Sequence, residues 1–147
     1  MIEKERKFEL LYPVYQDMKG IRIKQGYIMV KGKKHLRVRI LIGKKTTATL
    51  TYKSKIDDVT KLEYEYEIPL KDAFELYDST DIKLEKTRYK TKFDGNEVDI
   101  DVLDDGRCWV EIEFKKEIKK LPDYCGAEVT GQKEYSNIQI ALNNLTT

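Results

Sequence analysis

The sequence contains a single histidine, His35, and only two cysteines, Cys108 and Cys125. One histidine cannot build a zinc site of several histidines, and the two isolated cysteines lack the spacing of a metal-binding motif. We therefore expect both thiols to be reduced, as is typical of cytoplasmic proteins. No apolar run is long enough to cross a membrane, and the N-terminal segment lacks the apolar core of a signal peptide. These absences predict a cytoplasmic protein without a membrane partner.

Charged residues are abundant but nearly balanced. They make up 37% of the 147 residues, yet the formal net charge is only +2. A general nucleic-acid-binding domain would carry a basic excess, so the balance argues against a nucleic-acid partner. The length, together with the absence of repeats and linkers, predicts one domain over residues 1–147.

The charges are sorted along the chain, and this pattern is the most informative one. Glu3, Glu5 and Lys7 occupy alternate positions, so an extended strand would point all three to one face. Six further segments show the same alternation. They contain Arg37 and Arg39; Thr51 and Lys53; Glu63, Glu65 and Glu67; Lys86 and Arg88; Asp99 and Asp101; and Glu111 and Glu113.

Same-sign charges on one strand face need an explanation. Like charges two residues apart repel each other, and a neighbouring strand lies only about 4.8 Å away. One such strand would be interpreted as a solvated outer face. Seven of them indicate that other groups neutralise the charges: a divalent cation for the carboxylates and a polyanion for the lysines and arginines.

Alternation and a high content of β-branched and aromatic residues predict eight strands. The strands are expected at 2–9, 23–31, 35–43, 46–54, 62–69, 83–93, 96–103 and 108–117. Helices are expected near 12–19, at 70–78 and near 133–145. The opposite strand faces, which include Tyr64 and Tyr66, are too apolar to leave exposed, so the helices should cover them. We expect an α+β fold dominated by β structure: an eight-stranded antiparallel closed β-barrel with covering helices and a charged interior.

The ordered motifs resemble those of the triphosphate tunnel metalloenzymes, also called the CYTH domain family. The resemblance begins with Glu3-x-Glu5-x-Lys7 and covers the whole chain. The later blocks are Gln25-Gly26-Tyr27, Leu36-Arg37-Val38-Arg39, Leu50-Thr51-Tyr52-Lys53, Glu63-Tyr64-Glu65-Tyr66-Glu67, Lys86-Thr87-Arg88, Asp99-x-Asp101, Glu111-Ile112-Glu113, and Glu128-Val129-Thr130 followed by Tyr135-Ser136-Asn137. The short length is similar to that of the compact bacterial members, which mostly hydrolyse inorganic tripolyphosphate with Mg²⁺ or Mn²⁺.

The resemblance implies two sets of site residues. The basic set would bind the phosphates and stabilise the transition state, and consists of Lys7, Arg37, Arg39, Lys53, Lys86 and Arg88. Tyr27 and Lys133 would be accessory substrate contacts. The acidic set would bind the metal, and consists of Glu3, Glu5, Glu63, Glu65, Asp99, Glu111 and Glu113. Within residues 63–67 the interpretation favours Glu65, then Glu63, and Asp101 is an alternative to Asp99.

The function implied by the resemblance is metal-dependent hydrolysis of inorganic tripolyphosphate to pyrophosphate and phosphate, with water as the nucleophile. Thiamine triphosphatase, nucleoside triphosphatase and class IV adenylate cyclase are alternatives, although no adenine-recognising residues are evident for the cyclase. A polyphosphate-binding module is the non-enzymatic alternative, but it would not need so many paired carboxylates. The sequence leaves open the physiological triphosphate, the choice between Mg²⁺ and Mn²⁺, and the oligomeric state.

Overall fold

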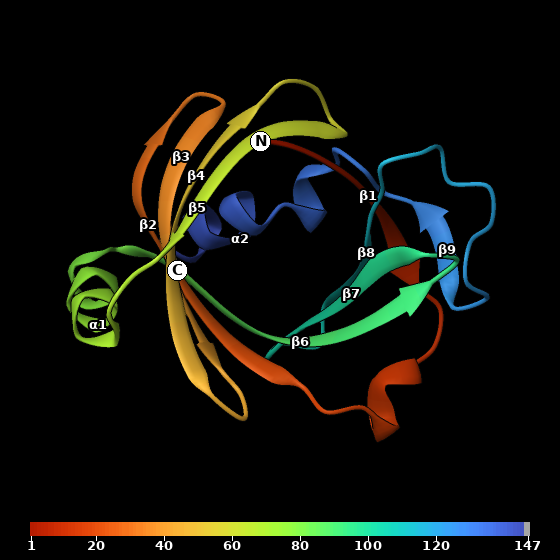
Figure 1. The fold of residues 1–147 in the computed structure, drawn as a ribbon, viewed down its shortest axis with the longest axis horizontal. Helices are drawn as coiled ribbons and strands as arrows, with labels where there is room; N and C mark the ends of the chain where they lie inside the picture. The colour runs from red at the N-terminus through yellow and green to blue at the C-terminus, as the bar shows by residue number, and fades with distance from the viewer. Residues whose placement is uncertain (146–147) are drawn as a thin grey trace.

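The computed structural model describes residues 1–145, which form mostly antiparallel β structure (Figure 1). The strands are β1 (Ile2–Leu10), β2 (Ile21–Lys31), β3 (Lys34–Ile42), β4 (Thr46–Lys55), β5 (Thr60–Glu67), β6 (Ile82–Phe93), β7 (Asn96–Leu103), β8 (Cys108–Glu113) and β9 (Cys125–Glu128). The α-helices are α1 (Leu70–Ser79) and α2 (Asn137–Asn144), and the short 3₁₀ helices are η1 (Val14–Asp17) and η2 (Lys133–Tyr135). Within this part of the chain, no helix is long and apolar enough to cross a membrane.

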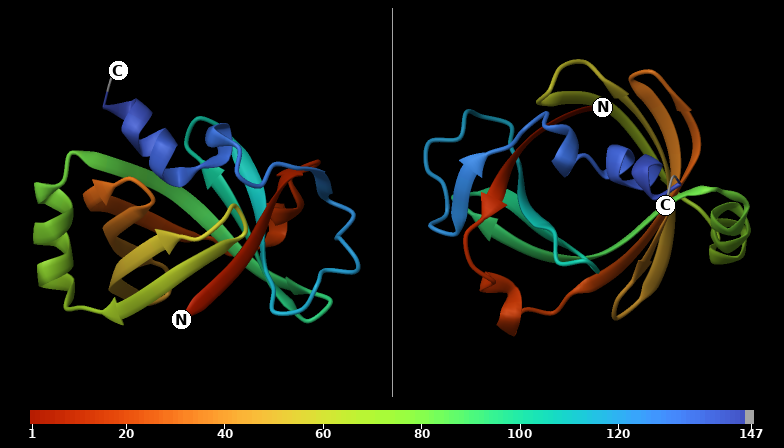
Figure 2. Two further views of the ribbon diagram at one scale, coloured as in Figure 1. Left: turned by 90° about the horizontal axis from the view of Figure 1, so that it is seen from above. Right: turned by 180° about the vertical axis from the view of Figure 1, so that it is seen from behind.

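Eight of the strands pair in a ring. Their order is β5-β4-β3-β2-β6-β7-β8-β1, and β1 also pairs with β5 (Figure 2). The start of β1 lies beside β5, with Ile2 opposite Leu62, and its later part lies beside β8, with Lys7 opposite Glu111. Every pairing around the ring is antiparallel, as the sequence predicted.

Apart from shifts of one or two residues at other strand ends, two details differ from the predicted strands. The strand expected at 108–117 ends at Glu113. A further short strand, β9, was not predicted; it pairs with the end of β1, where Phe8 lies opposite Glu128. The four residues of β9 carry too little alternation to be recognised from the sequence alone.

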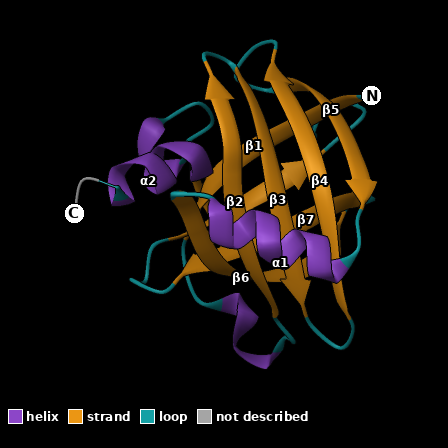
Figure 3. Ribbon diagram, turned by 90° about the vertical axis from the view of Figure 1, so that its left-hand side faces the viewer, coloured by secondary structure: helices purple, strands orange, loops and turns teal. Residues whose placement is uncertain are grey.

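Much of the apolar core lies on the outer faces of the strands, as predicted. The helix α1 lies across β3 and β4 (Figure 3). Its residues Ala73 and Tyr77 pack with Val38 and Ile40 of β3 and with Ala48 of β4. On the other side, residues of η1 and of the loop before β9 pack on the outer faces of β1, β7 and β8. That second cluster contains Phe8, Val98, Ile100, Val110 and Ile112, packed against residues that include Tyr15, Ile118 and Tyr124.

The prediction that helices cover the whole apolar face was wrong for β5. Tyr64 and Tyr66 are 45% and 65% exposed. The reason is that α1 lies across β2, β3 and β4 and does not extend over the outer face of β5.

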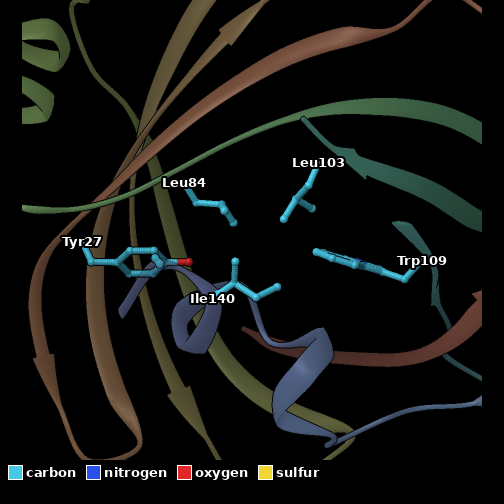
Figure 4. Close-up of a cluster of buried hydrophobic side chains, with 6 residues drawn as sticks. Tyr27, Leu84, Leu103, Trp109 and Ile140 are labelled. Atoms are coloured by element: carbon cyan, nitrogen blue, oxygen red, sulfur yellow. The ribbon is translucent and has the colours of Figure 1, made fainter. Parts of the chain in front are cut away.

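A third apolar cluster lies at one end of the ring. It joins Ile140 and Ala141 of α2 to Tyr27, Leu84, Leu103 and Trp109 from the strands (Figure 4). Seen down the ring, α2 lies within its outline, and seen from above it lies at one end (Figure 2). The C-terminal helix therefore fills one end of the ring.

We predict that Gly26→Ala destabilises the protein. A methyl group at this position of β2 would collide with the side-chain hydroxyl of Thr80, which is buried and donates a hydrogen bond to the Tyr77 carbonyl at 2.8 Å. Such overpacking costs about 1–3 kcal/mol, so urea unfolding should show a lower free energy of unfolding.

Gly43→Ala is the matched control, because the added methyl would meet Ile21 at an ordinary 3.6 Å. Its free energy of unfolding should stay within about 0.5 kcal/mol of the wild type. Equal stability of the two variants would contradict the close packing of β2 against Thr80.

Candidate active site

The inward faces of the strands, together with the segment that leads into α2, line one cavity of about 610 Å³. This volume is in the range of small-molecule binding sites. The structure brings nearly all the predicted site residues together there. Those lining the cavity are Glu3, Glu5, Lys7, Tyr27, Arg37, Arg39, Lys53, Glu63, Glu65, Arg88, Asp99, Glu111, Glu113 and Lys133.

Two arginines of β3 form the least compensated positive part of the cavity. Arg37 and Arg39 are 4% and 9% exposed, and neither forms an ion pair with any residue in 1–145. The Nε atom of Arg37 is buried without a hydrogen-bond partner. Burial, together with the charges of Arg37 and Arg88, lowers the pKa of Arg39 to about 9. This region has the donors and the charge to bind an anion.

Lys53 of β4 joins the basic and acidic parts of the cavity. Its Nζ atom lies 3.1 Å from Glu3 of β1 and 3.0 Å from Glu63 of β5. The strand register explains both contacts, since Lys53 is directly opposite Glu63 and the start of β1 pairs with β5. Glu65 accepts a hydrogen bond from Thr51 at 2.9 Å and is exposed, so Glu63 is the more enclosed of the two candidate metal ligands.

Arg88 of β6 is surrounded by carboxylates. It binds Asp101 through Nε and Nη2 at 2.8 and 2.9 Å, and lies 3.3 Å from both Asp99 and Glu111. Burial alone would lower the pKa of Arg88, but these carboxylates, Asp101 first, raise it well above its ordinary value. Arg88 is therefore a fixed cation, held in place from two neighbouring strands.

Lys86 lies behind the cavity wall rather than among its lining residues. It is fully buried, with Nζ 2.7 Å from Asp101 and 2.8 Å from Oδ1 of Asn137 at the start of α2. Burial lowers the pKa of Lys86 to about 7, although the charge of Asp101 opposes this shift. Here Lys86 links β6 and β7 to α2, whereas the sequence grouped it with the direct phosphate contacts.

Lys7 and Glu111 both contact the indole ring of Trp109. The indole Nε1 donates a hydrogen bond to Glu111 at 2.9 Å, and the Lys7 ammonium lies 5.3 Å from the centre of the indole. Lys7 also donates to the Tyr135 carbonyl at 2.7 Å and lies 3.5 Å from Glu111. Trp109 is fully buried, so it holds both charged groups in a fixed position.

The carboxylates crowd the opposite part of the cavity. Burial, followed by the charge of Glu111, raises the pKa of Glu5 to about 7. Burial, followed by the charges of Glu3, Glu63 and Asp99, raises the pKa of Glu113. Glu5 and Glu113 are direct neighbours across β1 and β8. The repulsion that other carboxylates exert on Glu5 and on Glu113 is the kind that a bound cation relieves.

These residues fit a divalent ion by their chemistry, since carboxylate oxygens are the ligands that Mg²⁺ and Mn²⁺ prefer. They do not form a preassembled coordination shell: among the described residues, no three carboxylate, histidine or cysteine side chains are grouped closely enough for a metal site. Mg²⁺ tolerates this arrangement because it keeps several waters and uses only one or two protein carboxylates.

Besides other residues that line the cavity, four polar or aromatic residues on the strands were not assigned to the site from the sequence. They are Gln25, His35, Lys61 and Trp109. Each precedes a residue of the predicted site by two positions on the same strand, so extending the alternation by one step would have found them. His35 has an unpartnered, buried Nε2 atom, and burial lowers its pKa to about 3, so the ring is neutral at ordinary pH.

The fold and these motifs agree with comparisons to known proteins. The family model of the CYTH domain matches residues 1–139. The chain belongs to the CYTH family. An inorganic triphosphatase of Acetivibrio thermocellus is 36% identical over an alignment of 149 positions. The alignment covers 96% of this chain and 94% of that protein.

Two solved structures have a similar fold. The crystal structure of the inorganic triphosphatase NE1496 has a TM-score of 0.65 and 30% identity, covering 95% of this chain and 94% of that one. The PH1819 protein of Pyrococcus horikoshii has a TM-score of 0.63 and 26% identity, covering 80% of each chain. The expected family membership is therefore confirmed.

The raised pKa of Glu5 predicts how stability depends on pH in the absence of metal. The folded protein keeps the Glu5 proton up to about pH 7, whereas an unfolded glutamate releases it near about pH 4.3. Stability is therefore lost as pH rises between these two values, and the deficit is complete above pH 7. Glu5→Gln removes this deficit, so in excess chelator its unfolding temperature should match the wild type at pH 4 and exceed it at pH 8.

Glu75→Gln is the control, because Glu75 is exposed on α1 and lies outside the cavity. Its difference from the wild type should not change with pH. A Glu5→Gln protein that is less stable than the wild type at pH 8 would mean that the Glu5 carboxylate is stabilised by its neighbours rather than crowded.

Proposed function

We propose that this protein hydrolyses inorganic tripolyphosphate to pyrophosphate and phosphate with the help of a divalent metal, Mg²⁺ or Mn²⁺. The single observation that carries the proposal is a cavity with two uncompensated charge sets. Arg37 and Arg39 form no ion pair among the described residues, and burial together with neighbouring carboxylates raises the pKa values of Glu5 and Glu113. In a metal–polyphosphate complex, the phosphates are complementary to the arginines and the metal ion is complementary to the glutamates. The similarity to inorganic triphosphatases supports the same substrate class.

In this proposal the ring of strands acts as a closed tunnel that holds the substrate. Arg37, Arg39 and Arg88 would donate hydrogen bonds to phosphate oxygens, with Lys7 and Lys53 as further cations around the chain. Because these groups are fixed by β3, β6 and their neighbours, they would stabilise the charge that develops on the leaving pyrophosphate without reorganising. A water molecule would attack the terminal phosphorus as the bridging P–O bond breaks.

Glu3, Glu5, Glu63, Asp99 and Glu113 are the residues that would hold the ion. A bound divalent ion would neutralise phosphate charge and help to activate the attacking water. Glu111 contacts Lys7, Arg88 and Trp109, so its main role would be to position those basic groups.

The filled end of the ring supports an inorganic substrate over a nucleotide or thiamine triphosphate. Ile140, Leu103 and Trp109 pack together at that end, where α2 lies (Figure 4). An organic group on the triphosphate would have to displace this cluster or remain outside the opposite opening.

The first test is hydrolysis by the purified protein. Phosphate release from tripolyphosphate should require Mg²⁺ or Mn²⁺ and should stop in excess chelator. The value of kcat/KM for tripolyphosphate should exceed the values for ATP and thiamine triphosphate. A higher value for either organic triphosphate would overturn the substrate assignment, and turnover without metal would overturn the mechanism.

Two variants should separate the roles of the charge sets. Arg39→Ala should lower kcat/KM by about 10- to 100-fold, because a hydrogen bond to a charged group contributes about 1.5–3 kcal/mol. Glu113→Gln should mainly raise the metal concentration needed for half-maximal rate. Arg107→Ala and Glu75→Gln are controls on exposed residues outside the cavity and should resemble the wild type. Superimposable metal titrations of Arg39→Ala and Glu113→Gln would contradict this division.

Metal and polyanion should also stabilise the folded protein. A ligand present at a hundredfold excess over its dissociation constant stabilises the folded state by about 2.7 kcal/mol. The two ligands should reinforce each other, because each screens charge that repels the other. Thermal unfolding with Mn²⁺ alone, tripolyphosphate alone and both together measures the effect. An unchanged midpoint in all three conditions would show that these side chains face bulk water.

A further inference from the structure

Arg39 is held in place by a neutral side chain. Its Nε and Nη2 atoms donate hydrogen bonds to the amide oxygen of Gln25 at 3.1 and 3.0 Å. The two residues lie directly opposite each other on β2 and β3, and Gln25 is fully buried. A guanidinium is usually held in this two-point manner by a carboxylate, which would also cancel its charge.

Three other inward-facing bases of the site each have a carboxylate partner. Lys7 lies near Glu111, Lys53 near Glu3 and Glu63, and Arg88 near Asp99, Asp101 and Glu111. Arg39 differs because its buried hydrogen-bond partner carries no charge. The positive charge at this position is therefore available to a ligand.

A third hydrogen bond fixes the Gln25 amide. Its Nε2 atom donates to the hydroxyl of Tyr27 at 2.9 Å, and Tyr27 is itself 3% exposed. In the reverse orientation the amide NH₂ would face the donors of Arg39, which would be unfavourable. The chain Arg39–Gln25–Tyr27 therefore has one stable arrangement, and it leaves Nη1 of Arg39 free of protein hydrogen bonds within residues 1–145.

We propose that Gln25 is a positioning residue for the polyphosphate, because it fixes the Arg39 guanidinium towards the anion site without neutralising its charge. This inference rests on the proposed function and adds a specific role to it. The neighbouring Arg37 has an unpartnered Nε atom, so the two arginines present unused donors side by side on β3. Because the Gln25 amide is neutral, it does not cancel the positive charges of these two arginines.

The decisive substitution is Gln25→Glu, which keeps the size and the acceptor atoms but adds a negative charge. The introduced carboxylate would still hold Arg39, so the unfolding temperature of the ligand-free protein should be equal to or higher than that of the wild type. The dissociation constant for inorganic tripolyphosphate, measured by calorimetry in excess chelator, should rise by about tenfold or more because the site loses one positive charge. KM should rise in parallel in the metal-dependent assay.

Gln25→Met separates positioning from charge. It fills a similar volume but removes all three side-chain hydrogen bonds of Gln25, so the unfolding temperature should fall and kcat should fall together with affinity. If Gln25 served only to stabilise the fold, the affinity for tripolyphosphate would fall only in a variant whose unfolding temperature also falls. The predicted signature is instead weak binding by a stable Gln25→Glu protein. Gln16→Glu adds the same charge to an exposed residue of η1 outside the cavity and is the control.

The outcomes distinguish this inference from the proposed function. A wild type that neither binds nor hydrolyses tripolyphosphate overturns both. A wild type that does so, with Gln25→Glu equal to it in affinity and KM, overturns only the role of Gln25. If Gln25→Glu fails to fold, Gln25→Met decides: wild-type kcat and affinity in that variant would also overturn the role.

Discussion

The structure depends on holding many ionised side chains inside one ring of strands, where each loses part of its contact with water. Removing a charge from water costs several kcal/mol unless partners replace the lost solvation. Cross-strand pairs supply most of that compensation, as between Lys53 and Glu63 or Arg88 and Asp101. The compensation is incomplete at two places, beside Arg37 and Arg39 and beside Glu5. There the protein keeps an electrostatic cost that a ligand can remove.

The position of the apolar core follows from this use of the interior. Because the inward faces carry charge, burial of apolar surface takes place outside the ring and at one end. The helix α1 covers part of one outer face, η1 and the loop before β9 cover another, and α2 fills the end with Ile140 and Ala141. The hydrophobic effect thus stabilises the strands from outside, while their inner faces carry the charged groups. This arrangement holds the charged groups of the cavity in fixed positions.

Rigidity is supplied inside the cavity by groups that orient charge without cancelling it. Trp109 binds Glu111 and lies against Lys7, and Gln25 binds Arg39. An indole N–H and an amide orient the charged side chains through hydrogen bonds and leave the net charge of the cavity unchanged. Positioned, desolvated charges stabilise a transition state more than mobile ones in water, because no reorganisation is needed during the reaction. The proposed phosphoryl transfer is the type of chemistry that depends most on such positioning.

The sequence by itself determined which side chains face inward, because the period of two is a local property of a strand. Alternation therefore predicted the eight strands of the ring and most of the charged residues that line the cavity. The tertiary structure decided which of them reach the cavity. Lys86 and Arg88 share a strand face, yet Lys86 is buried against Asp101 and Asn137 because α2 covers that end. Likewise, strand register alone placed Lys53 between Glu3 and Glu63, and Arg39 against Gln25. How deeply each charged side chain is buried, and which residues it contacts, depend on pairing between segments that are distant in the sequence. The sequence of one strand alone does not contain this information.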